Sequence, residues 1–246
     1  MPVNFYLVVV AQFVVFLLFV FFAKDKGRPV RSILLRSIAF GIPLGIAFDL
    51  LCGVLEIHTY LPLVVHTDPF CDCGLTFAEL LWNGALSYGT AIATAYYLTR
   101  PAFPITNMQT RKLFTLITSV IICIAVCITL LAEKHSMTVL FACGFVVVGA
   151  GELLLLLRGM AGPILSPFVN GDFQSLAFLW LKVTWIAIAY EVANHYFPVW
   201  SWLPGSAYDS IHIEQVIIVF GYAGLFHSMI VFWQLTGLHS RKNVVS

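Results

Sequence analysis

The sequence predicts an all-α protein that crosses a membrane several times. Hydrophobic residues make up 60% of the 246 positions and charged residues only 10%, whereas soluble domains carry about 25% charged residues. The apolar residues are spread along the whole chain, as expected for a polytopic membrane protein. Inside lipid, each backbone N–H and C=O needs a partner within its own segment, so every spanning run should be a helix. The net charge of +1 excludes a general electrostatic attraction to nucleic acid.

Seven apolar runs reach the roughly 20 residues that a spanning helix needs. They cover residues 3–23, 34–56, 76–98, 113–132, 137–157, 174–197 and 211–235. The first run lacks a basic leading segment and a small-residue cleavage site, so we interpret it as a retained helix and not as a signal peptide. We therefore expect a single transmembrane domain over residues 1–246.

Charges in the connections between these runs predict the orientation. The first and third connections and the C-terminal tail are basic, with Lys24, Lys26, Arg28, Arg31, Arg36, Arg100, Arg111, Lys112, Arg241 and Lys242. The even-numbered connections carry acids instead: Glu56, Asp68, Asp72, Glu133 beside Lys134, and Asp209. The positive-inside rule then places the N-terminus on the non-cytoplasmic side and the C-terminus in the cytoplasm.

An acidic motif occurs in both halves of the chain. Asp49 precedes Tyr60-Leu61-Pro62 by the same spacing that separates Glu191 from Trp202-Leu203-Pro204. Such duplication predicts two parallel units, each of three helices, related by an axis along the membrane normal. The units would cover about 3–98 and 137–235, with a linker helix at 113–132 in a 3+1+3 arrangement.

Each motif is followed by another acid at the head of the next apolar run, Glu79 in the first half and Glu214 in the second. All four carboxyl groups should lie at similar depth, about one to two helical turns below the non-cytoplasmic surface. An ionisable group in hydrocarbon is expensive. We therefore interpret Asp49, Glu79, Glu191 and Glu214 as a catalytic acid/base set facing one another across the axis. For any single acid, a structural hydrogen bond to a neighbouring helix remains an alternative.

Aromatic and polar residues surround these acids. Glu79 and Asn83 are four residues apart and share a helix face, as do Glu191 and His195. The residues expected to contact a substrate are Tyr60, Trp82, Asn83, Tyr190, His195, Trp200 and Trp202. Aromatic residues near the interface also form membrane belts, which is the alternative for the tryptophans.

Glu152 and Lys182 form a second candidate pair. They should lie at matched depth on neighbouring helices, and their opposite charges predict a structural ion pair. Two alternatives remain for the lysine, namely that it extends to the membrane interface or carries a retinal-type Schiff base.

The doubled pattern resembles the integral-membrane lycopene cyclases, both the heterodimeric bacterial type and the fused fungal type. The matching residues of the first half are Phe48-Asp49, His58, Tyr60, Pro62 and Ala78-Glu79, and those of the second half are Tyr190-Glu191, Trp200, Trp202, Pro204 and Ile213-Glu214. This chain departs from the family pattern in lacking the proline before the second acid and in keeping one acid of a Glu-Glu pair. The resemblance therefore implies a lycopene cyclase or a related terpenoid or meroterpenoid cyclase.

The implied reaction is a cyclisation without redox change. It begins with proton donation to a C=C bond or an epoxide, proceeds through a carbocation and ends with proton removal. A carboxyl group in a dry pocket stays protonated near neutrality, and aromatic faces stabilise a cation. We expect a lipophilic isoprenoid substrate, no metal and no cofactor, since the chain has no dinucleotide or diphosphate-ionising motif. The alternatives are a small transporter with 3+1+3 repeats and a non-catalytic lipid-binding membrane subunit.

Overall fold

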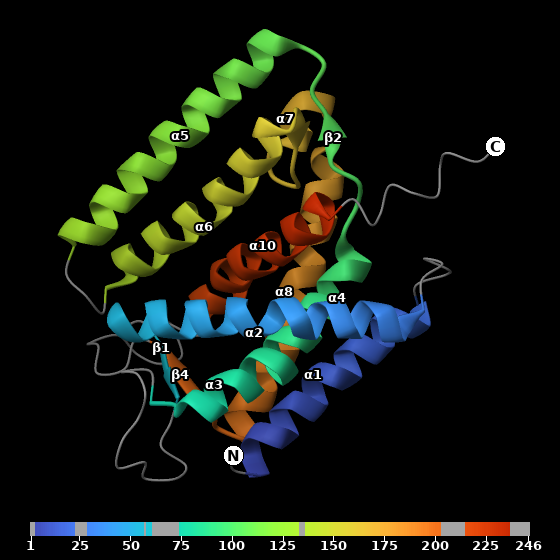
Figure 1. Ribbon diagram of the computed structural model, residues 1–246, viewed down its shortest axis with the longest axis vertical. Coiled ribbons are helices and arrows are strands. Elements are labelled where there is room, and N and C mark those ends of the chain that lie inside the picture. The colour runs from blue at the N-terminus through green and yellow to red at the C-terminus, as the bar shows by residue number, and fades with distance from the viewer. Residues whose placement is uncertain are drawn as a thin grey trace.

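The computed structural model describes residues 3–22, 29–56, 58–60, 74–132, 136–202 and 215–236, most of which are helical, as predicted (Figure 1). Within these ranges, six helices are long and apolar enough to cross a membrane. They are α1 (Val3–Phe22), α2 (Val30–Val54), α5 (Met108–Leu131), α6 (Met137–Leu157), α8 (Phe173–Tyr196) and the run Ile217–Leu235, which comprises the π-helical η2 (Ile217–Gly221) and α10 (Tyr222–Leu235). The chain is therefore a multi-pass membrane protein.

The run predicted at 76–98 is helical but changes its winding. It consists of α3 (Phe77–Asn83), the π-helical η1 (Gly84–Tyr88) and α4 (Gly89–Leu98). Nine of the ten residues of α4 are buried, and the helix packs against α1, α2 and α10. Small residues dominate α4, which lets these neighbours approach it closely. This run therefore lies at the centre of the bundle, and its status as a seventh span remains a prediction.

Glycines bring α2 into backbone contact with this central run. A Cβ atom at Gly41 would lie 2.4 Å from the carbonyl oxygen of Gly84 and 2.7 Å from the backbone nitrogen of Gly89. One turn further along α2, a Cβ atom at Gly45 would lie 2.8 Å from the Cα atom of Gly84. Only glycine fits such contacts, which are those of a Gly-x-x-x-Gly helix interface. The contact places the end of α2, including Asp49, against η1.

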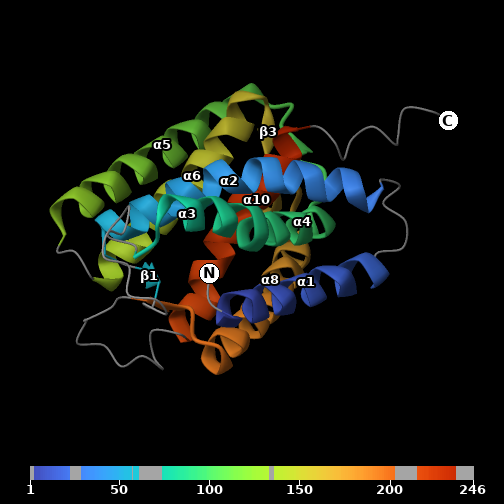
Figure 2. The same cartoon turned by 60° about the horizontal axis from the view of Figure 1, so that its bottom comes forward.

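The predicted linker helix is α5, which lies at the edge of the bundle beside α6 in both views (Figures 1 and 2). Most of its large apolar side chains are exposed, as suits a helix that faces lipid. Two short strands, β2 (Phe103–Pro104) and β3 (Met160–Ala161), pair near the start of α5 and the end of α6. A short helix, α7 (Ser166–Asn170), then leads into α8.

Several basic residues that we assigned to connections belong to helices. Arg31 and Arg36 lie in the first turns of α2, and Arg111 and Lys112 lie near the start of α5. The helices begin earlier than their apolar runs because a long basic side chain can cover apolar surface with its stem and still reach water with its charge.

The two acidic motifs meet in a short antiparallel strand pair. β1 (His58–Tyr60) follows α2 and β4 (Trp200–Trp202) follows α8. The middle residues of the two strands, Thr59 and Ser201, face each other. Thr59 lies ten residues after Asp49, and Ser201 lies ten residues after Glu191. The central positions of the two motifs thus pair with each other, the flanking positions exchange partners, and the strand pair is locally two-fold symmetric.

Candidate functional site

Asp49 is the centre of the first polar cluster. Its side chain is fully buried, at 0% exposure, near the end of α2. Tyr88 Oη donates to Oδ1 over 2.8 Å, Asn83 Nδ2 donates to Oδ2 over 2.8 Å, and Tyr60 Oη donates to Oδ1 over 3.3 Å. Asn83 Nδ2 also lies 2.5 Å from Tyr60 Oη. The donors come from β1, α3 and η1, so the carboxyl group joins these elements to α2.

The hydroxyl of Tyr60 stays protonated and therefore acts as a hydrogen-bond donor. Burial raises its pKa well above the ordinary value, and the neighbouring Asp49 carboxyl raises the pKa further. Tyr60 therefore keeps its proton at any physiological pH and stabilises negative charge on Asp49.

Glu191 is the centre of the second cluster. It is 5% exposed in the last third of α8. Three donors converge on its Oε1 atom: Tyr222 Oη at 2.8 Å, Trp202 Nε1 at 3.1 Å and Trp200 Nε1 at 3.3 Å. Asn194 Nδ2 approaches Oε2 at 3.5 Å and also donates to the backbone carbonyl of Trp200. Asn194 thereby holds β4 against the end of α8.

The two clusters are built in the same way. In each half, the acid binds an aromatic donor eleven residues further on, Tyr60 in β1 and Trp202 in β4. Each acid also binds a tyrosine at the end of a π-helical segment, because Tyr88 ends η1 and Tyr222 directly follows η2. The duplication inferred from the acids thus extends to their hydrogen-bond partners.

In both halves, the aromatic residue before the acid makes a ring contact with the tyrosine that donates to that acid. Phe48 and Tyr88 have ring centroids 5.9 Å apart, and Tyr190 and Tyr222 have ring centroids 6.0 Å apart. Both pairs are tilted or edge-on, which is the favoured geometry for aromatic rings. Tyr88 and Tyr222 are therefore each also held in place by a ring from the helix that carries the acid to which they donate.

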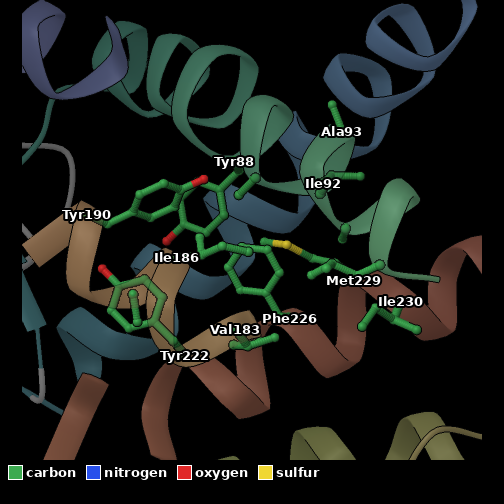
Figure 3. Close-up of a cluster of buried hydrophobic side chains, with 14 of the residues drawn as sticks. Tyr88, Ile92, Ala93, Val183, Ile186, Tyr190, Tyr222, Phe226, Met229 and Ile230 are labelled. Atoms are coloured by element: carbon green, nitrogen blue, oxygen red, sulfur yellow. The ribbon is translucent and has the colours of Figure 1, made fainter. Parts of the chain in front are cut away.

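A cavity of about 570 Å³ lies between these clusters and the apolar core. Apolar and aromatic side chains supply most of its wall, and the donors Tyr60, Tyr88, Trp200, Trp202 and Tyr222 are among them. Figure 3 shows the rings of Tyr88, Tyr190 and Tyr222 gathered beside apolar side chains of α8 and α10. The two carboxyl groups lie behind this wall. Asp49 and Glu191 are not among the lining residues, whereas their aromatic donors are, and the expectation that the acids face one another stays a prediction.

Glu79 has a different environment from the one expected. It forms a capping box at the start of α3, in which the Thr76 backbone N–H and hydroxyl donate to Oε2 at 2.9 and 2.8 Å. The Glu79 backbone N–H donates to Thr76 Oγ1 at 3.3 Å. A threonine followed three residues later by a glutamate is the sequence signature of this cap. The counterpart of Glu79 in the second half, Glu214, lies outside the described residues.

Five of the seven predicted substrate-contacting residues belong to the two clusters or the cavity wall. They are Tyr60, Asn83, Tyr190, Trp200 and Trp202. The other two residues, Trp82 and His195, lie outside the clusters and the cavity wall. Trp82 is 58% exposed, because it neighbours the buried Asn83 and points away from the core. His195 is exposed at the last turn of α8, where Asn194 makes the inward contacts instead.

The structure does not form the predicted ion pair between Glu152 and Lys182. Glu152 is 2% exposed and lies 2.8 Å from Nε2 of His227 in α10, while Lys182 is exposed on α8. Backbone N–H groups of Gly162 and Ile164 donate to the same carboxylate at 2.9 Å each. Glu152 makes these contacts because α6 packs against α10 and the turn after β3 folds back over it. His227 also contributes to the cavity wall.

Sequence reasoning missed four residues of the site: Tyr88, Asn194, Tyr222 and His227. The two tyrosines had a signal, since Tyr88 follows Glu79 by nine residues and Tyr222 follows Glu214 by eight. Aligning the two halves of the sequence past Glu79 and Glu214 brings these two tyrosines to nearly the same position. His227 has no counterpart in the first half, and only the packing of α6 on α10 identifies its partner.

No protein-family model, curated protein or solved structure matches this chain. Within the described ranges, no group of three or more histidine, cysteine, aspartate or glutamate side chains is placed to hold a metal ion.

Proposed function

We propose that the chain is an integral-membrane isoprenoid cyclase that works by proton transfer without redox change. The observation that carries the proposal is one apolar cavity whose wall contains the hydrogen-bond donors of two separate buried carboxyl groups. A cyclisation through a carbocation needs one group that gives a proton and another that removes one. Two similar centres at one cavity provide such a pair, and the resemblance to membrane lycopene cyclases implies the same chemistry.

Tyrosine hydroxyls would connect the acids to the substrate. A hydroxyl both donates and accepts, so it can give its proton to a substrate carbon or oxygen while it takes one from the carboxylic acid behind it. Asp49 has two such hydroxyls, from Tyr60 and Tyr88. Among the donors to Oε1 of Glu191 in the described part of the chain, Tyr222 carries a hydroxyl, whereas Trp200 and Trp202 are indoles that donate only.

The proposed reaction balances protons between the two centres. One protonated centre adds a proton to a C=C bond or an epoxide, and the resulting cation is attacked by another C=C bond, which closes the ring. The second centre, as a carboxylate, then receives a proton from the carbon next to the new cation. Aromatic faces in the wall stabilise the intermediate charge, and a cavity of this size lies within the roughly 300–1,000 Å³ range of ligand pockets.

A lipid-binding subunit without catalysis is the second candidate. One observation favours it, namely that both carboxyl groups are hydrogen-bonded behind the cavity wall and are not part of the wall. Such acids could serve only to fix the aromatic side chains. The two functions differ in whether the bound lipid is converted chemically.

The deciding experiment expresses the chain in cells supplied with linear polyenes and prenylated aromatics, followed by mass spectrometry of the lipids. A cyclase is expected to yield a product with the mass of its substrate but a different retention time and fewer C=C bonds. Cells that express the Asp49→Asn/Glu191→Gln double variant serve as the control. An unchanged lipid that copurifies with the wild-type chain would support the lipid-binding subunit instead.

We also propose seven spans in a 3+1+3 arrangement, with the N-terminus outside and the C-terminus in the cytoplasm. The centrally placed helical run from α3 to α4 supports the seventh span, and the basic connections support the orientation. An odd number of spans puts the termini on opposite sides of the membrane, whereas six spans would put them on the same side. Protease digestion of sealed vesicles with an epitope tag at each terminus is expected to remove only the N-terminal tag from right-side-out vesicles. Loss or protection of both tags would refute the topology.

A further inference from the structure

Gln12 is a buried amide in an otherwise apolar part of α1. The helix packs against α4 and α8, and the Gln12 side chain is 3% exposed. Its Oε1 atom has no hydrogen-bond partner in the described part of the chain. Gln12 also lines the cavity. A polar group in a membrane helix usually bonds to a neighbouring helix, and Gln12 makes no such bond to the helices that surround it.

Tyr190 presents a second polar group of this kind. Its ring is 2% exposed and belongs to the cavity wall, where it meets the ring of Tyr222. Its hydroxyl has no hydrogen bond of normal geometry in the described ranges, and the neighbouring polar side chain is that of Thr94, whose own hydroxyl donates to the Thr90 carbonyl. Tyr190 is therefore unlike Tyr60, Tyr88 and Tyr222, whose hydroxyls are bonded to the acids.

An unsatisfied polar group in a dry site is costly, so buried amides and hydroxyls normally find partners. Three such groups belong to residues of the wall of this one cavity, namely Gln12 Oε1, the Tyr190 hydroxyl and His227 Nδ1, and their gathering indicates that a ligand is the missing partner. The carbonyl oxygen of Gln12 needs a donor, and a tyrosine hydroxyl can donate to an oxygen. A ligand hydroxyl meets both needs, and it suits the amide in either orientation because it donates and accepts. A hydrocarbon ligand would leave both groups unsatisfied.

We propose that Gln12 and Tyr190 bind a hydroxyl group of the ligand, so that the cavity takes an isoprenoid alcohol or phenol in preference to a hydrocarbon. This inference rests on the proposed function in treating the cavity as the ligand site, but it does not depend on catalysis. The proposal names the substrate class. It also gives Gln12 the role of binding the ligand hydroxyl, which neither the acids nor their aromatic partners perform.

Two saturated probes separate binding from turnover: the alcohol phytanol and its parent hydrocarbon phytane. Neither contains a C=C bond, so neither can be protonated and cyclised. The full chain in lipid nanodiscs is equilibrated with each probe, and retained probe is measured by mass spectrometry after subtraction of the amount held by empty nanodiscs. The variants are Gln12→Leu and Tyr190→Phe. Gln109→Leu and Tyr6→Phe make the same changes at exposed positions and serve as controls.

The wild-type chain is expected to retain phytanol roughly 10-fold more tightly than phytane, because each satisfied hydrogen bond in a buried site corresponds to a few-fold to about 10-fold change in affinity. The preference should fall to about threefold or less in each cavity variant and stay unchanged in the two controls. Retention of phytane by each variant shows that its cavity is intact.

The outcomes that overturn the inference are distinct from those that overturn the proposed function. An unchanged preference in both Gln12→Leu and Tyr190→Phe refutes the assigned residues. Equal retention of the two probes by the wild-type chain refutes the hydroxyl-bearing ligand but leaves the cavity as a lipid site. Retention of neither probe above the empty nanodiscs shows that the cavity is not a ligand site, and both proposals then fall.

Discussion

Asp49→Asn and Glu191→Gln are each expected to lower the rate of product formation by at least about 100-fold, since general acid–base catalysis contributes roughly 10²–10⁴-fold. Each amide keeps an oxygen that can accept the hydrogen bond of Tyr88 or Tyr222. The aromatic wall should therefore survive, while the group that exchanges a proton is lost. The measurement is turnover in nanodiscs of the substrate that the lipid panel identifies, together with the melting temperature of each variant.

Glu79→Gln is the matched control for these two variants. Glu79 is also a buried acid, but it caps α3 through Thr76, and glutamine serves equally well at that position of a capping box. We expect this variant to keep its turnover within about threefold, because no catalytic proton transfer is lost. Full activity of the Asp49→Asn and Glu191→Gln variants would refute the proposed centres. Loss of activity in all three variants with lowered melting temperatures would show that the acids act through stability alone.

Gly41→Ala is expected to destabilise the fold by about 3 kcal/mol or more, at or above the upper end of the usual cost of overpacking. The added methyl group would meet backbone atoms of Gly84 and Gly89 at 2.4–2.9 Å. Backbone atoms cannot rotate away as a flexible side chain can, so α2 and the central run must separate. The separation would also move Asp49 away from Asn83 and Tyr88. Thermal unfolding in detergent measures the loss.

Gly144→Ala is the control, because a Cβ atom at Gly144 in α6 would meet no heavy atom within 4 Å. Replacing a glycine within a helix by alanine stabilises by roughly 0.5–1 kcal/mol when space allows. The two alanine variants should therefore shift the melting temperature in opposite directions. Equal melting temperatures for Gly41→Ala and the wild-type chain would show that the helices do not meet through this contact.

The sequence predicted the spans well because exposing an unpaired peptide group to lipid is costly, and a helix is the main structure that pairs every peptide group within its own segment. It predicted less well where helices start and how they wind. Arg31 precedes the apolar run but belongs to α2, and the change from α3 to the π-helical η1 has no hydropathy signal. The glycines that fix the α2 contact are small apolar residues, and hydropathy alone cannot separate an interface glycine from a lipid-facing one.

The site was predictable only in part, and the reason is geometric. Asp49 and Glu191 could be identified because a charge in an apolar run is unusual. The position of these two acids behind the cavity wall depends on where β1 and β4 cross the ends of α2 and α8. The pairing of Thr59 with Ser201 sets that crossing. Matched depth suggested Lys182 for Glu152, but depth carries no information on which helix faces lie together, and His227 occupies that face.

The pairing of β1 with β4 also bears on the order of events during biosynthesis. β1 cannot find its partner until the ribosome has added Trp202, more than 140 residues after His58. Contacts of such long separation form late, so β1 remains unpaired while most of the second half is synthesised. A chain arrested before residue 200 would already contain Tyr60, Asn83 and Tyr88, which all donate to Asp49, but it would lack the strand that pairs with β1.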